Sequence, residues 1–378
     1  MSVPIWISGT KQSFGGDNVF VVAEIGKNFI QTEDDRPVAE YLQNAKELVD
    51  AAVASGADAV KFQTHEVEDE VLNTEFISPH FKARGSERYS WVTRNTKATP
   101  LESFWKPLKQ YCDQRGIIFF STPMSRKAAQ KLDQVGVPFW KVGSGDILDF
   151  VMLDYMRYSG KPIILSSGMS TQEEVERAVE FLREKNDRVV LLHCVSKYPC
   201  PPEALHLKTI EFYKERFAMP IGFSDHSLDI DSALAAVTMG ATILEKHFSM
   251  SRTLFGADHQ VSLTPREFTD LVNGIREVQK NPAKRKEVLK SEFVQKGMGN
   301  KAKVLQDGEA VFRPLFRKSL MAGQDIPAGT ILGPEMIYAM RPQQYAGGLP
   351  SERYKEVLGK KTKKALKKYD PITEEILR

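Results

Sequence analysis

Eight short apolar segments alternate with helical patterns between residue 19 and about residue 280, and this alternation restricts the fold of the chain more than any other feature. Each segment is about four to eight residues long and rich in Val, Ile or Phe, as parallel strands buried on both faces are. The segments lie at 19–26, 58–64, 116–123, 139–145, 162–168, 189–195, 220–227 and 241–248. The pattern predicts an α/β fold, a (β/α)8 TIM barrel, with an open doubly wound sheet as the alternative.

Amphipathic patterns fill the intervals between the apolar segments. At 41–55, 172–182 and 265–278, apolar residues recur on one face of a helix. The connection at 65–100 is longer than most loops of compact domains, and loops of that length are usually functional or disordered. Two interpretations of this connection stay open: a lid over a site, and an irregular insertion.

The 378 residues are enough for one large and one small domain. We expect the barrel to occupy residues 1–282. Residues 283–310 are basic and poor in bulky apolar side chains, which indicates a solvated linker more than a nucleic-acid patch. Short strand and turn signals at 311–378 predict a small, mostly β domain.

Composition argues against several classes of protein. The net charge is +3, which is too small to indicate nucleic-acid binding. The three cysteines show no CxxC spacing, which indicates a reducing compartment and no disulfide framework. Residues 1–20 lack the pattern of a signal peptide, and no apolar run has membrane-spanning length. We therefore expect a cytoplasmic protein that binds neither nucleic acid nor membrane.

Polar residues follow the predicted strands at the ends that a barrel gathers on one face, where barrel enzymes carry their catalytic groups. The acidic residues at these ends are Glu24, Asp146, Asp225, Glu245 and Asp258. A condensation followed by attack of water needs a base, and Glu24, at the end of the first strand, is the best placed candidate. A helix cap or a salt bridge is the alternative role for this residue.

Two histidines end neighbouring strands. His226 lies in GFSDHS at the end of the seventh predicted strand, and His247 lies in LEKHF at the end of the eighth. Two neutral imidazoles form a partial site for a divalent transition metal, which water and substrate oxygens can complete. His193, inside the sixth strand, is a possible third ligand, but a buried and hydrogen-bonded histidine is the favoured interpretation. Among the remaining histidines, only His259 is expected near this site.

Cations and hydroxyl donors suited to phosphate lie at the same strand ends. Lys61 belongs to the second predicted strand and Lys141 to the fourth. Hydroxyl groups come from Thr122, Ser144, Ser166, Ser167 and Ser224. The nucleotide-binding sequences Walker A and GxGxxG do not occur. The set therefore predicts a phosphorylated ligand that is bound by side chains.

The ordered motifs of the chain resemble those of the sialic acid (N-acetylneuraminate) synthase family over nearly its full length. The matching stretches are AEIGKN, ADAVKFQTH, FFSTPMS, WKVGSGD, PIILSSGM, LLHCVSKYP, GFSDHSLD, ILEKHF and GADHQVSL. Nearer the C-terminus, FRKSLMAGQDIPAGTIL and LGKK resemble the antifreeze-like (SAF, β-clip) domain that follows the barrel in that family.

The resemblance implies a reaction and the residues that carry it. Members of the family condense phosphoenolpyruvate with the open-chain aldehyde of an N-acetylated hexosamine such as N-acetylmannosamine, and they release phosphate. His226 and His247 would bind the metal, commonly Mn²⁺ with Mg²⁺ or Co²⁺ as alternatives, and Glu24 would handle a proton or the attacking water. The positions matching phosphoenolpyruvate-binding residues are Lys61, Thr122, Lys141, Ser144, Ser166, Ser196 and Ser224. The positions expected around the acceptor sugar are Gln63, Asp146, Tyr198 and Asp258.

Arg341 matches an arginine that reaches the sugar of the partner subunit in that family, which implies a domain-swapped homodimer.

Three departures from the family pattern leave the identity of the acceptor sugar open. Phe29 replaces the histidine of AEIG-x-N-H, and Lys27 occupies the variable position. Asp146 stands where a glutamate is common. The turn that begins with Arg341 and Pro342 continues as QQYAGG, where the family has a short glycine-containing turn. All three departures are expected near the acceptor sugar.

Several functions therefore remain in competition. GADHQVSL favours N-acetylneuraminate as the product over pseudaminic acid. Another nonulosonate synthase, which makes legionaminic or pseudaminic acid from a modified hexose, is the first alternative. A carbohydrate-binding barrel without turnover is the second, and the retained histidines, lysines and Glu24 argue against it.

Overall fold

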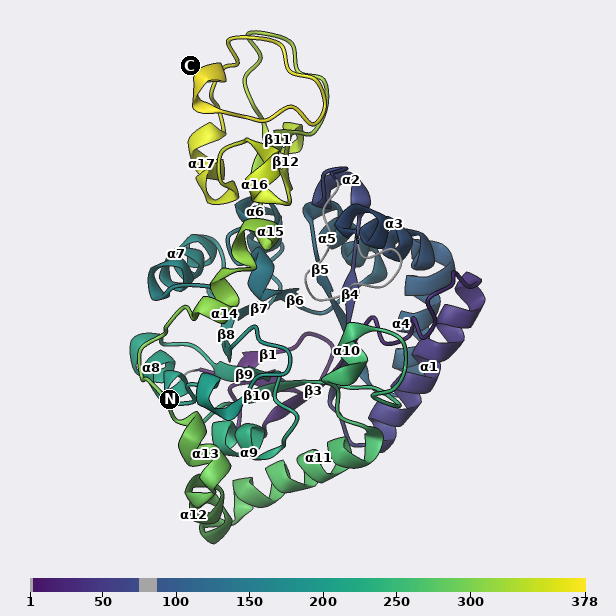
Figure 1. Cartoon of the computed structure of the whole chain (residues 1–378), viewed down its shortest axis with the longest axis vertical. Helices are drawn as coiled ribbons and strands as arrows, with labels where there is room; N and C mark the ends of the chain where they lie inside the picture. Colours follow the sequence, from purple (N-terminus) through teal and green to yellow (C-terminus); the bar gives the residue numbers. More distant parts are fainter. Residues whose placement is uncertain (1–2, 75–86) are drawn as a thin grey trace.

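An eight-stranded parallel sheet, curled into a nearly closed barrel, forms the centre of the computed structural model, which describes residues 3–74 and 87–378 (Figure 1). Its strands are β3 (Phe20–Gly26), β4 (Ala59–Thr64), β5 (Ile118–Pro123), β6 (Trp140–Val142), β7 (Ile163–Ser166), β8 (Val189–Cys194), β9 (Ile221–Asp225) and β10 (Ile243–His247). The order is β5-β4-β3-β10-β9-β8-β7-β6, so the first and the last barrel strand pair with each other. The barrel prediction is confirmed, because an open doubly wound sheet would leave β3 and β10 unpaired.

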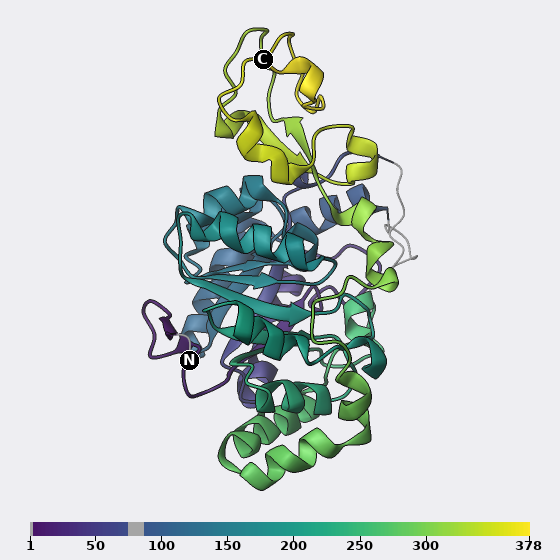
Figure 2. The same ribbon diagram turned by 90° about the vertical axis from the view of Figure 1, so that its left-hand side faces the viewer.

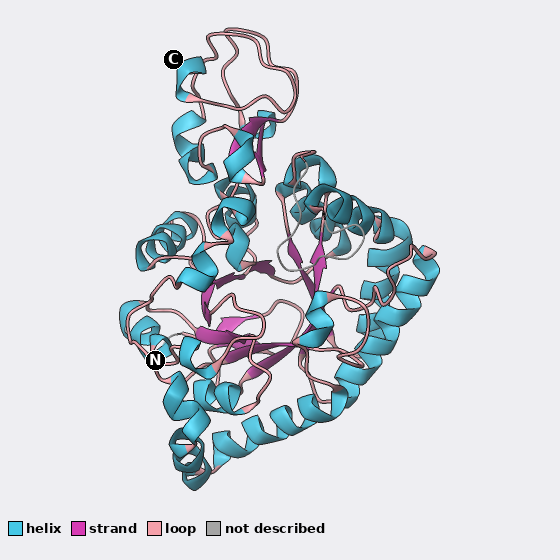
Figure 3. Cartoon of the chain, in the orientation of Figure 1, coloured by secondary structure: helices cyan, strands magenta, loops and turns pink. Residues whose placement is uncertain are grey.

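Helices surround the sheet (Figure 3). They are α1 (Val38–Ala54), α4 (Lys106–Gln114), α5 (Arg126–Val135), α6 (Phe150–Arg157), α7 (Gln172–Arg183), α8 (Thr209–Arg216), α9 (Asp231–Thr238) and α11 (Pro265–Lys280). The predicted patterns at 41–55, 172–182 and 265–278 correspond to α1, α7 and α11. Capping boxes begin α7, with Thr171 and Glu174, and α11, with Thr264 and Glu267. Among the described residues, no helix is both long and apolar enough to cross a membrane.

A small N-terminal hairpin closes the barrel at the end where the strands begin (Figure 2). It pairs β1 (Ile5–Trp6) with β2 (Ser13–Phe14), and the sequence analysis did not predict it. The buried ring of Phe14 packs edge-on against Phe20 and Phe139, with centroids 5.1 and 5.0 Å away. Aromatic packing therefore fills the barrel at the N-terminal ends of its strands. A functional site can form only at the opposite end, where the strands terminate.

The segment expected to be a solvated linker is largely helical and partly buried. It contains α12 (Pro282–Lys290), α13 (Glu292–Gly297) and α14 (Asp307–Ala310), and α15 (Arg313–Phe316) follows. Glu309 is fully buried, and its Oε1 accepts hydrogen bonds from the backbone N–H groups of Met169 and Ser196. Because these two residues follow β7 and β8, the segment crosses the C-terminal end of the barrel (Figure 2).

The C-terminal domain packs on the rim of the barrel (Figure 1). Its regular elements are β11 (Ser319–Ala322), β12 (Ile337–Met340), α16 (Gln343–Ala346) and α17 (Tyr354–Val357), and β11 pairs with β12 in antiparallel fashion. Lys318 lies 2.7 Å from Asp149 of the barrel, and Arg126 donates to Pro334 O. Arg341 forms an isolated parallel bridge with Val71, which brings it to the mouth of the barrel.

Candidate active site

The C-terminal ends of the strands open into a cavity of about 350 Å³. Strand alternation decides which side chains enter it. On β10, Glu245 and His247 line the cavity, whereas Lys246 between them points away and pairs with Asp225, Nζ to Oδ2 2.5 Å. The residues assigned above to catalysis, to the substrates and to the metal all line this cavity: Glu24, Lys61, Gln63, Thr122, Lys141, Ser144, Asp146, Ser166, Ser196, Tyr198, Ser224, His226, His247, Asp258 and Arg341. Two other strand-end residues named above do not line it: Ser167 donates to Leu192 O at 2.9 Å, and Asp225 pairs with Lys246.

Two buried lysines share one carboxylate in the cavity. Lys61 Nζ lies 3.6 Å and Lys141 Nζ 3.7 Å from Glu245 Oε1. Burial lowers the pKa of Lys141, with Glu245 opposing the shift. Burial would also lower the pKa of Lys61, but Glu24 and Glu245 outweigh it and raise the pKa. The two lysines therefore bring positive charge to the buried floor of the cavity.

Hydroxyl groups accompany both lysines. Lys61 Nζ donates to Thr122 Oγ1 at 3.1 Å, and Lys141 Nζ donates to Ser166 Oγ at 2.6 Å. An ammonium group beside a hydroxyl matches the oxygens of a phosphate or carboxylate. This pairing of cation and hydroxyl occurs on β4 with β5, and again on β6 with β7.

Further hydroxyls lie at the ends of β6, β8 and β9. Ser224 donates to Glu245 at 3.1 Å, and Ser144 accepts from the backbone N–H of Gly168 at 3.1 Å. Ser196 Oγ is buried without a hydrogen-bond partner among the described residues. A Cβ on Gly168 would lie 2.3 Å from Ser196 Oγ and 2.6 Å from Ser144 Oγ, so the backbone can approach these hydroxyls only as glycine.

Glu24 stands between the lysines and the rest of the cavity. Its Oε2 lies 2.7 Å from Lys61 Nζ, and its Oε1 accepts from Gln63 Nε2 at 2.9 Å. Burial raises the pKa of Glu24 to about 7, although Lys61 opposes the shift. The salt bridge foreseen as an alternative is present, and the same carboxyl titrates where a general base works best.

The two strand-end histidines lie together. The ring centroids of His226 and His247 are 5.5 Å apart. His226 Nδ1 donates to Val195 O at 2.8 Å, which leaves the lone pair on Nε2. His247 Nδ1 is buried without a hydrogen-bond partner among the described residues, and burial lowers the pKa of this ring to about 4. Both rings thus keep a nitrogen that suits a metal.

The donor set near these rings is incomplete. In residues 3–74 and 87–378, no group of three or more His, Cys, Asp or Glu side chains is arranged to hold a metal ion. His193, the possible third ligand, is buried, and its Nε2 lies 2.7 Å from Leu205 O, as the favoured interpretation expected. The two imidazoles therefore fit a divalent ion only as a partial shell, which water or substrate has to complete.

Gln63 and Asp258, two of the residues expected around the acceptor sugar, lie at the end of β3. A Cβ on Gly26 would lie 3.1 Å from Asp258 Oδ2 and 3.2 Å from Gln63 Nε2, so both side chains approach the same backbone. The Tyr198 ring lies 4.1 Å from the His226 ring, centroid to centroid. Polar side chains and one aromatic face thus adjoin the metal-binding candidates, which suits a sugar.

Asp146 and Arg341 meet at the rim of the cavity. The fully buried guanidinium of Arg341 donates to Asp146 Oδ1, and Lys318 lies 3.0 Å from the same oxygen. Both cations come from the C-terminal domain of the same chain. In this single chain, therefore, Arg341 reaches the cavity of its own barrel.

Sequence reasoning missed a group of residues in the 65–100 connection. The structure forms α2 (Val67–Glu70) and α3 (Arg88–Ala98) there, and residues 75–86 lie outside the described part, so the choice between lid and irregular insertion is not settled. The connection adds to the cavity lining His65, Arg88, Trp91, Arg94 and Asn95. The i, i+3, i+7 spacing of Arg88, Trp91 and Asn95 was a usable signal, since it places the three on one helix face.

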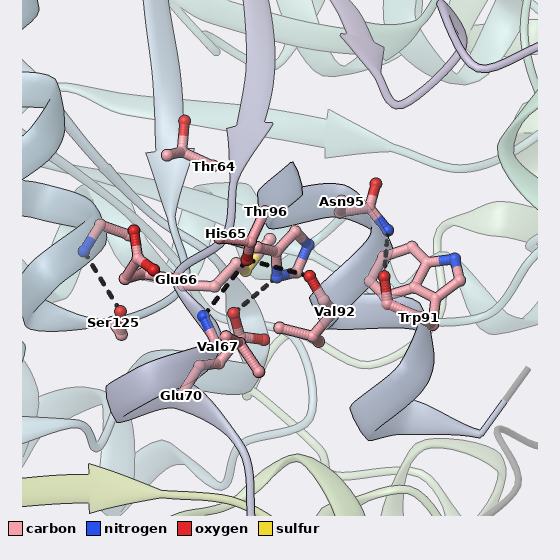
Figure 4. Close-up of polar contacts among 12 residues, drawn as sticks. Thr64, His65, Glu66, Val67, Glu70, Trp91, Val92, Asn95, Thr96 and Ser125 are labelled. Carbon is pink, nitrogen blue, oxygen red and sulfur yellow. Dashed lines mark hydrogen bonds and ion pairs between the residues drawn. The ribbon is translucent and has the colours of Figure 1, made fainter. Parts of the chain in front are cut away.

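A short hydrogen bond anchors this region. His65 Nδ1 and Glu70 Oε2 are 2.6 Å apart, and the His65 ring meets Trp91 edge-on with centroids 4.9 Å apart (Figure 4). Glu70 Oε1 accepts from Arg88 at 2.9 Å. The buried carboxylate thereby ties α2 to the start of α3.

Two expectations about the acceptor are wrong. Phe29 does not line the cavity: its ring is fully buried and packs against Phe104, centroids 4.9 Å apart, and against Tyr41. Residues 343–348, the QQYAGG turn, do not line it either: residues 343–346 form α16, of which only Ala346 is buried. Of these departures from the family pattern, Lys27 and Asp146 are the ones that line the cavity.

Fold and site together define a barrel enzyme with its polar groups at the C-terminal strand ends. The model of the NeuB family matches residues 48–287, and the model of the SAF domain matches residues 317–378. The chain belongs to the NeuB family, and it is a synthase-type transferase related to sialic acid and other nonulosonate synthases.

Relatives with different products share this similarity. The N-acetylneuraminate-9-phosphate synthase of Homo sapiens is 31% identical over 363 residues, 95% of this chain and 92% of the human protein. The N,N'-diacetyllegionaminic acid synthase of Campylobacter jejuni is 32% identical over 336 residues, 88% of this chain and 95% of that protein. A solved spore coat polysaccharide biosynthesis protein of Bacillus subtilis has a TM-score of 0.78 and 28% identity, and the match covers 100% of this chain and 99% of that one.

Proposed function

We propose that the protein condenses phosphoenolpyruvate with the open-chain aldehyde of an N-acetylated hexose of the N-acetylmannosamine type. The products are N-acetylneuraminate, or a related nonulosonate, and phosphate. The observation that carries the proposal is the buried pair Lys61 and Lys141, each beside a hydroxyl, next to a carboxyl with a pKa of about 7. The names of the human and Campylobacter relatives support the same class of reaction.

Each group has a place in the proposed reaction. Lys61 and Lys141 hold the anionic oxygens of phosphoenolpyruvate and offset the charge that develops on phosphate. The enol carbon attacks the aldehyde carbon, so the new C–C bond forms, the π electrons of the aldehyde pass to its oxygen, and C2 is left cationic. The aldehyde oxygen becomes a hydroxyl by taking up the proton that Glu24 removes from water in the next step. Water adds at C2 and gives a proton to Glu24, whose raised pKa suits this transfer. The tetrahedral intermediate then expels phosphate: the C2–O bond to phosphate breaks, the C2 hydroxyl becomes a carbonyl, and its proton leaves with the phosphate.

His226 and His247 would hold the divalent metal, Mn²⁺ in the first instance, with Mg²⁺ or Co²⁺ as alternatives. When bound, such an ion supplies Lewis acidity toward the aldehyde oxygen. The contact between His226 Nδ1 and Val195 O fixes the ring in the tautomer that presents Nε2.

Phosphate release from phosphoenolpyruvate tests the proposal. The assay contains Mn²⁺ and a panel of acceptors that includes N-acetylmannosamine and modified hexoses, with His226→Ala and a chelator as controls. We expect release that needs an acceptor, and its loss by at least about 100-fold in both controls. Calorimetry should show that His226→Ala binds Mn²⁺ at least about tenfold more weakly than the unaltered protein does. Folded, metal-loaded protein that releases no phosphate with any acceptor would refute the proposal and favour a non-catalytic barrel.

We propose two further properties, an oligomeric state and a cellular compartment. A homodimer follows from the resemblance alone, and co-expression of two inactive variants tests whether its C-terminal domains are swapped. A cytoplasmic enzyme suits the three cysteines, which are buried free thiols.

A further inference from the structure

The segment between the barrel and the C-terminal domain passes beside the ends of β7 and β8, where α14 and α15 lie (Figure 1). Glu309, in α14, is fully buried but does not line the cavity. Its Oε1 accepts hydrogen bonds from the backbone N–H of Met169, at 2.9 Å, and from that of Ser196, at 2.8 Å. One carboxylate oxygen therefore ties the turn after β7 to the end of β8.

Arg317 holds the same turn from its other side. Its Nη2 donates to Met169 O at 2.6 Å and to Ser170 Oγ at 3.0 Å. Its Nη1 donates to Ser144 O, in the turn after β6, at 3.3 Å. Arg317 is buried and does not line the cavity either. Together with Glu309, it joins the turns that follow β6, β7 and β8.

Met169 has a backbone conformation that needs such support. Its φ is 52°, in the left-handed region that residues other than glycine rarely adopt. Both of its backbone polar groups are bound by the segment, the N–H by Glu309 and the C=O by Arg317. Strained conformations of this kind persist only where the surrounding structure over-determines them, and they cluster at functional sites. The two side chains therefore keep the turn in a conformation that it would not hold alone.

The turn held in this way adjoins the hydroxyls expected to bind phosphoenolpyruvate. Gly168 lies in the turn, and its N–H donates to Ser144 Oγ at 3.1 Å. The N–H of Ser196 is bound by Glu309, while its Oγ is buried without a hydrogen-bond partner among the described residues. Ser144 and Ser196 both line the cavity. A shift of the turn would therefore displace both hydroxyls, although Glu309 itself lies outside the cavity.

We propose that Glu309 and Arg317 are positioning residues for phosphoenolpyruvate. By binding both backbone groups of Met169, they hold the turns after β6, β7 and β8 at the spacing that this substrate needs. The inference rests on the proposed function and deepens it. Two residues of a segment that joins the domains then act on the substrate site without touching the substrate.

Calorimetry with phosphoenolpyruvate tests this role without turnover. Glu309→Ala removes the shared acceptor, and we expect it to weaken phosphoenolpyruvate binding at least about tenfold. In the phosphate-release assay, KM for phosphoenolpyruvate should rise by a similar factor, while KM for the acceptor stays unchanged. Glu309→Gln keeps an oxygen that can accept from both N–H groups, so its affinity should stay within about threefold of that of the unaltered protein.

The Met169→Gly background shows whether Glu309 acts through the strained turn. Glycine adopts a positive φ without a steric penalty, so the turn then needs less support. In this background, Glu309→Ala should weaken phosphoenolpyruvate binding by no more than about threefold. An equal loss in the two backgrounds would overturn the inference, because a contact that only stabilises the fold would not depend on residue 169.

Gln306→Ala is the matched control. Gln306 also ties the segment to the barrel through two hydrogen bonds, since it donates to Ala204 O at 2.7 Å and accepts from Lys197 Nζ at 2.9 Å, and it does not line the cavity. We expect its affinity for phosphoenolpyruvate to be unchanged. A loss equal to that of Glu309→Ala would assign the effect to docking of the segment in general and overturn the inference, as would unchanged binding in Glu309→Ala.

Arg317→Lys carries the test if Glu309→Ala does not fold. An ammonium group cannot bridge two turns as the guanidinium fork does, so we expect phosphoenolpyruvate binding at least about fivefold weaker, and unchanged binding would overturn the inference. The proposed function fails separately, if the unaltered protein binds no phosphoenolpyruvate and releases no phosphate with any acceptor.

Discussion

Glu24 shows how burial and one neighbour set the chemistry of a single residue. The side chain is almost fully enclosed, and desolvation raises its pKa to about 7 even though Lys61 Nζ lies 2.7 Å away. Glu245, in the same cavity, has its pKa lowered, because Lys141 and Lys61 outweigh the effect of burial. Two carboxyls a few ångströms from the same lysine thus differ in acidity, and only Glu24 can exchange a proton near neutral pH.

Glu24→Gln should lower kcat by about 10²–10⁴-fold, because the amide cannot accept the proton of water. The base is active when deprotonated, so kcat/KM of the unaltered protein should rise with pH and level off above about 7. A pH profile of phosphate release measures this limb, and the melting temperature of the variant serves as the control for folding. If the Glu24→Gln variant were about as active as the unaltered protein, or if the pH profile were flat from about pH 5.5 to 8, Glu24 would not be the general base.

Residues at strand ends could be predicted from the barrel rule, whereas cavity residues on connections, such as Tyr198 and Asp258, came only from the family resemblance. Lys61, Lys141 and Glu24 sit in or at the end of apolar runs, and the barrel rule alone brings such positions to one face. Phe29 was misplaced, because a residue four positions beyond a strand can turn into the core, where its ring meets Phe104. Lys27 was recorded only as a departure from a pattern, since its surroundings depend on contacts distant in sequence, such as the Trp91 ring, whose centroid lies 4.8 Å from Lys27 Nζ.

At the scale of elements, the strands were predictable because all eight are buried on both faces. The observed bounds differ from the predicted ones by a few residues; β6, for example, ends at Val142 before a short 3₁₀ turn at Ser144–Asp146. Helices α2 and α3 escaped prediction, because their stability comes from tertiary contacts. Glu70 accepts hydrogen bonds from His65 Nδ1 and Arg88 Nη2. The backbone N–H of Val67 donates to Thr96 Oγ1, and Figure 4 shows this bond together with the one between His65 and Glu70.

The turn between β7 and α7 permits a test of the phosphate-binding hydroxyls. Gly168→Ala would place a Cβ 2.3 Å from Ser196 Oγ and 2.6 Å from Ser144 Oγ, so at least one hydroxyl has to move. We expect KM for phosphoenolpyruvate to rise by at least about tenfold with little change in unfolding temperature. Gly333→Ala is the control, because a Cβ there meets nothing within 4 Å. An unchanged KM in Gly168→Ala would show that these hydroxyls do not bind that substrate.

At the scale of the whole molecule, the C-terminal domain completes the cavity. Arg341 contacts Asp146 of the barrel, and Lys318 contacts both Asp146 and Asp149. The segment that leads to this domain is held down on its own barrel, because buried Glu309 accepts from two backbone N–H groups there. The chain therefore reaches its own cavity without crossing to a partner, unlike the swap that the resemblance implies.

Mixing two inactive variants distinguishes these arrangements. Lys61→Ala removes a barrel lysine, and Arg341→Ala removes the arginine of the C-terminal domain; the two chains are co-expressed with different tags and purified through both. If each domain serves its own barrel, as the contact of Arg341 with Asp146 indicates, every cavity in a mixed assembly lacks one group. Activity should then stay at the level of the separate variants. In a swapped dimer, one cavity of each mixed pair would receive both groups, and activity would return to about half of the original. Light scattering on the same sample gives the number of chains, so recovered activity in a mixed dimer would establish the swap and show that the linker passes to the partner.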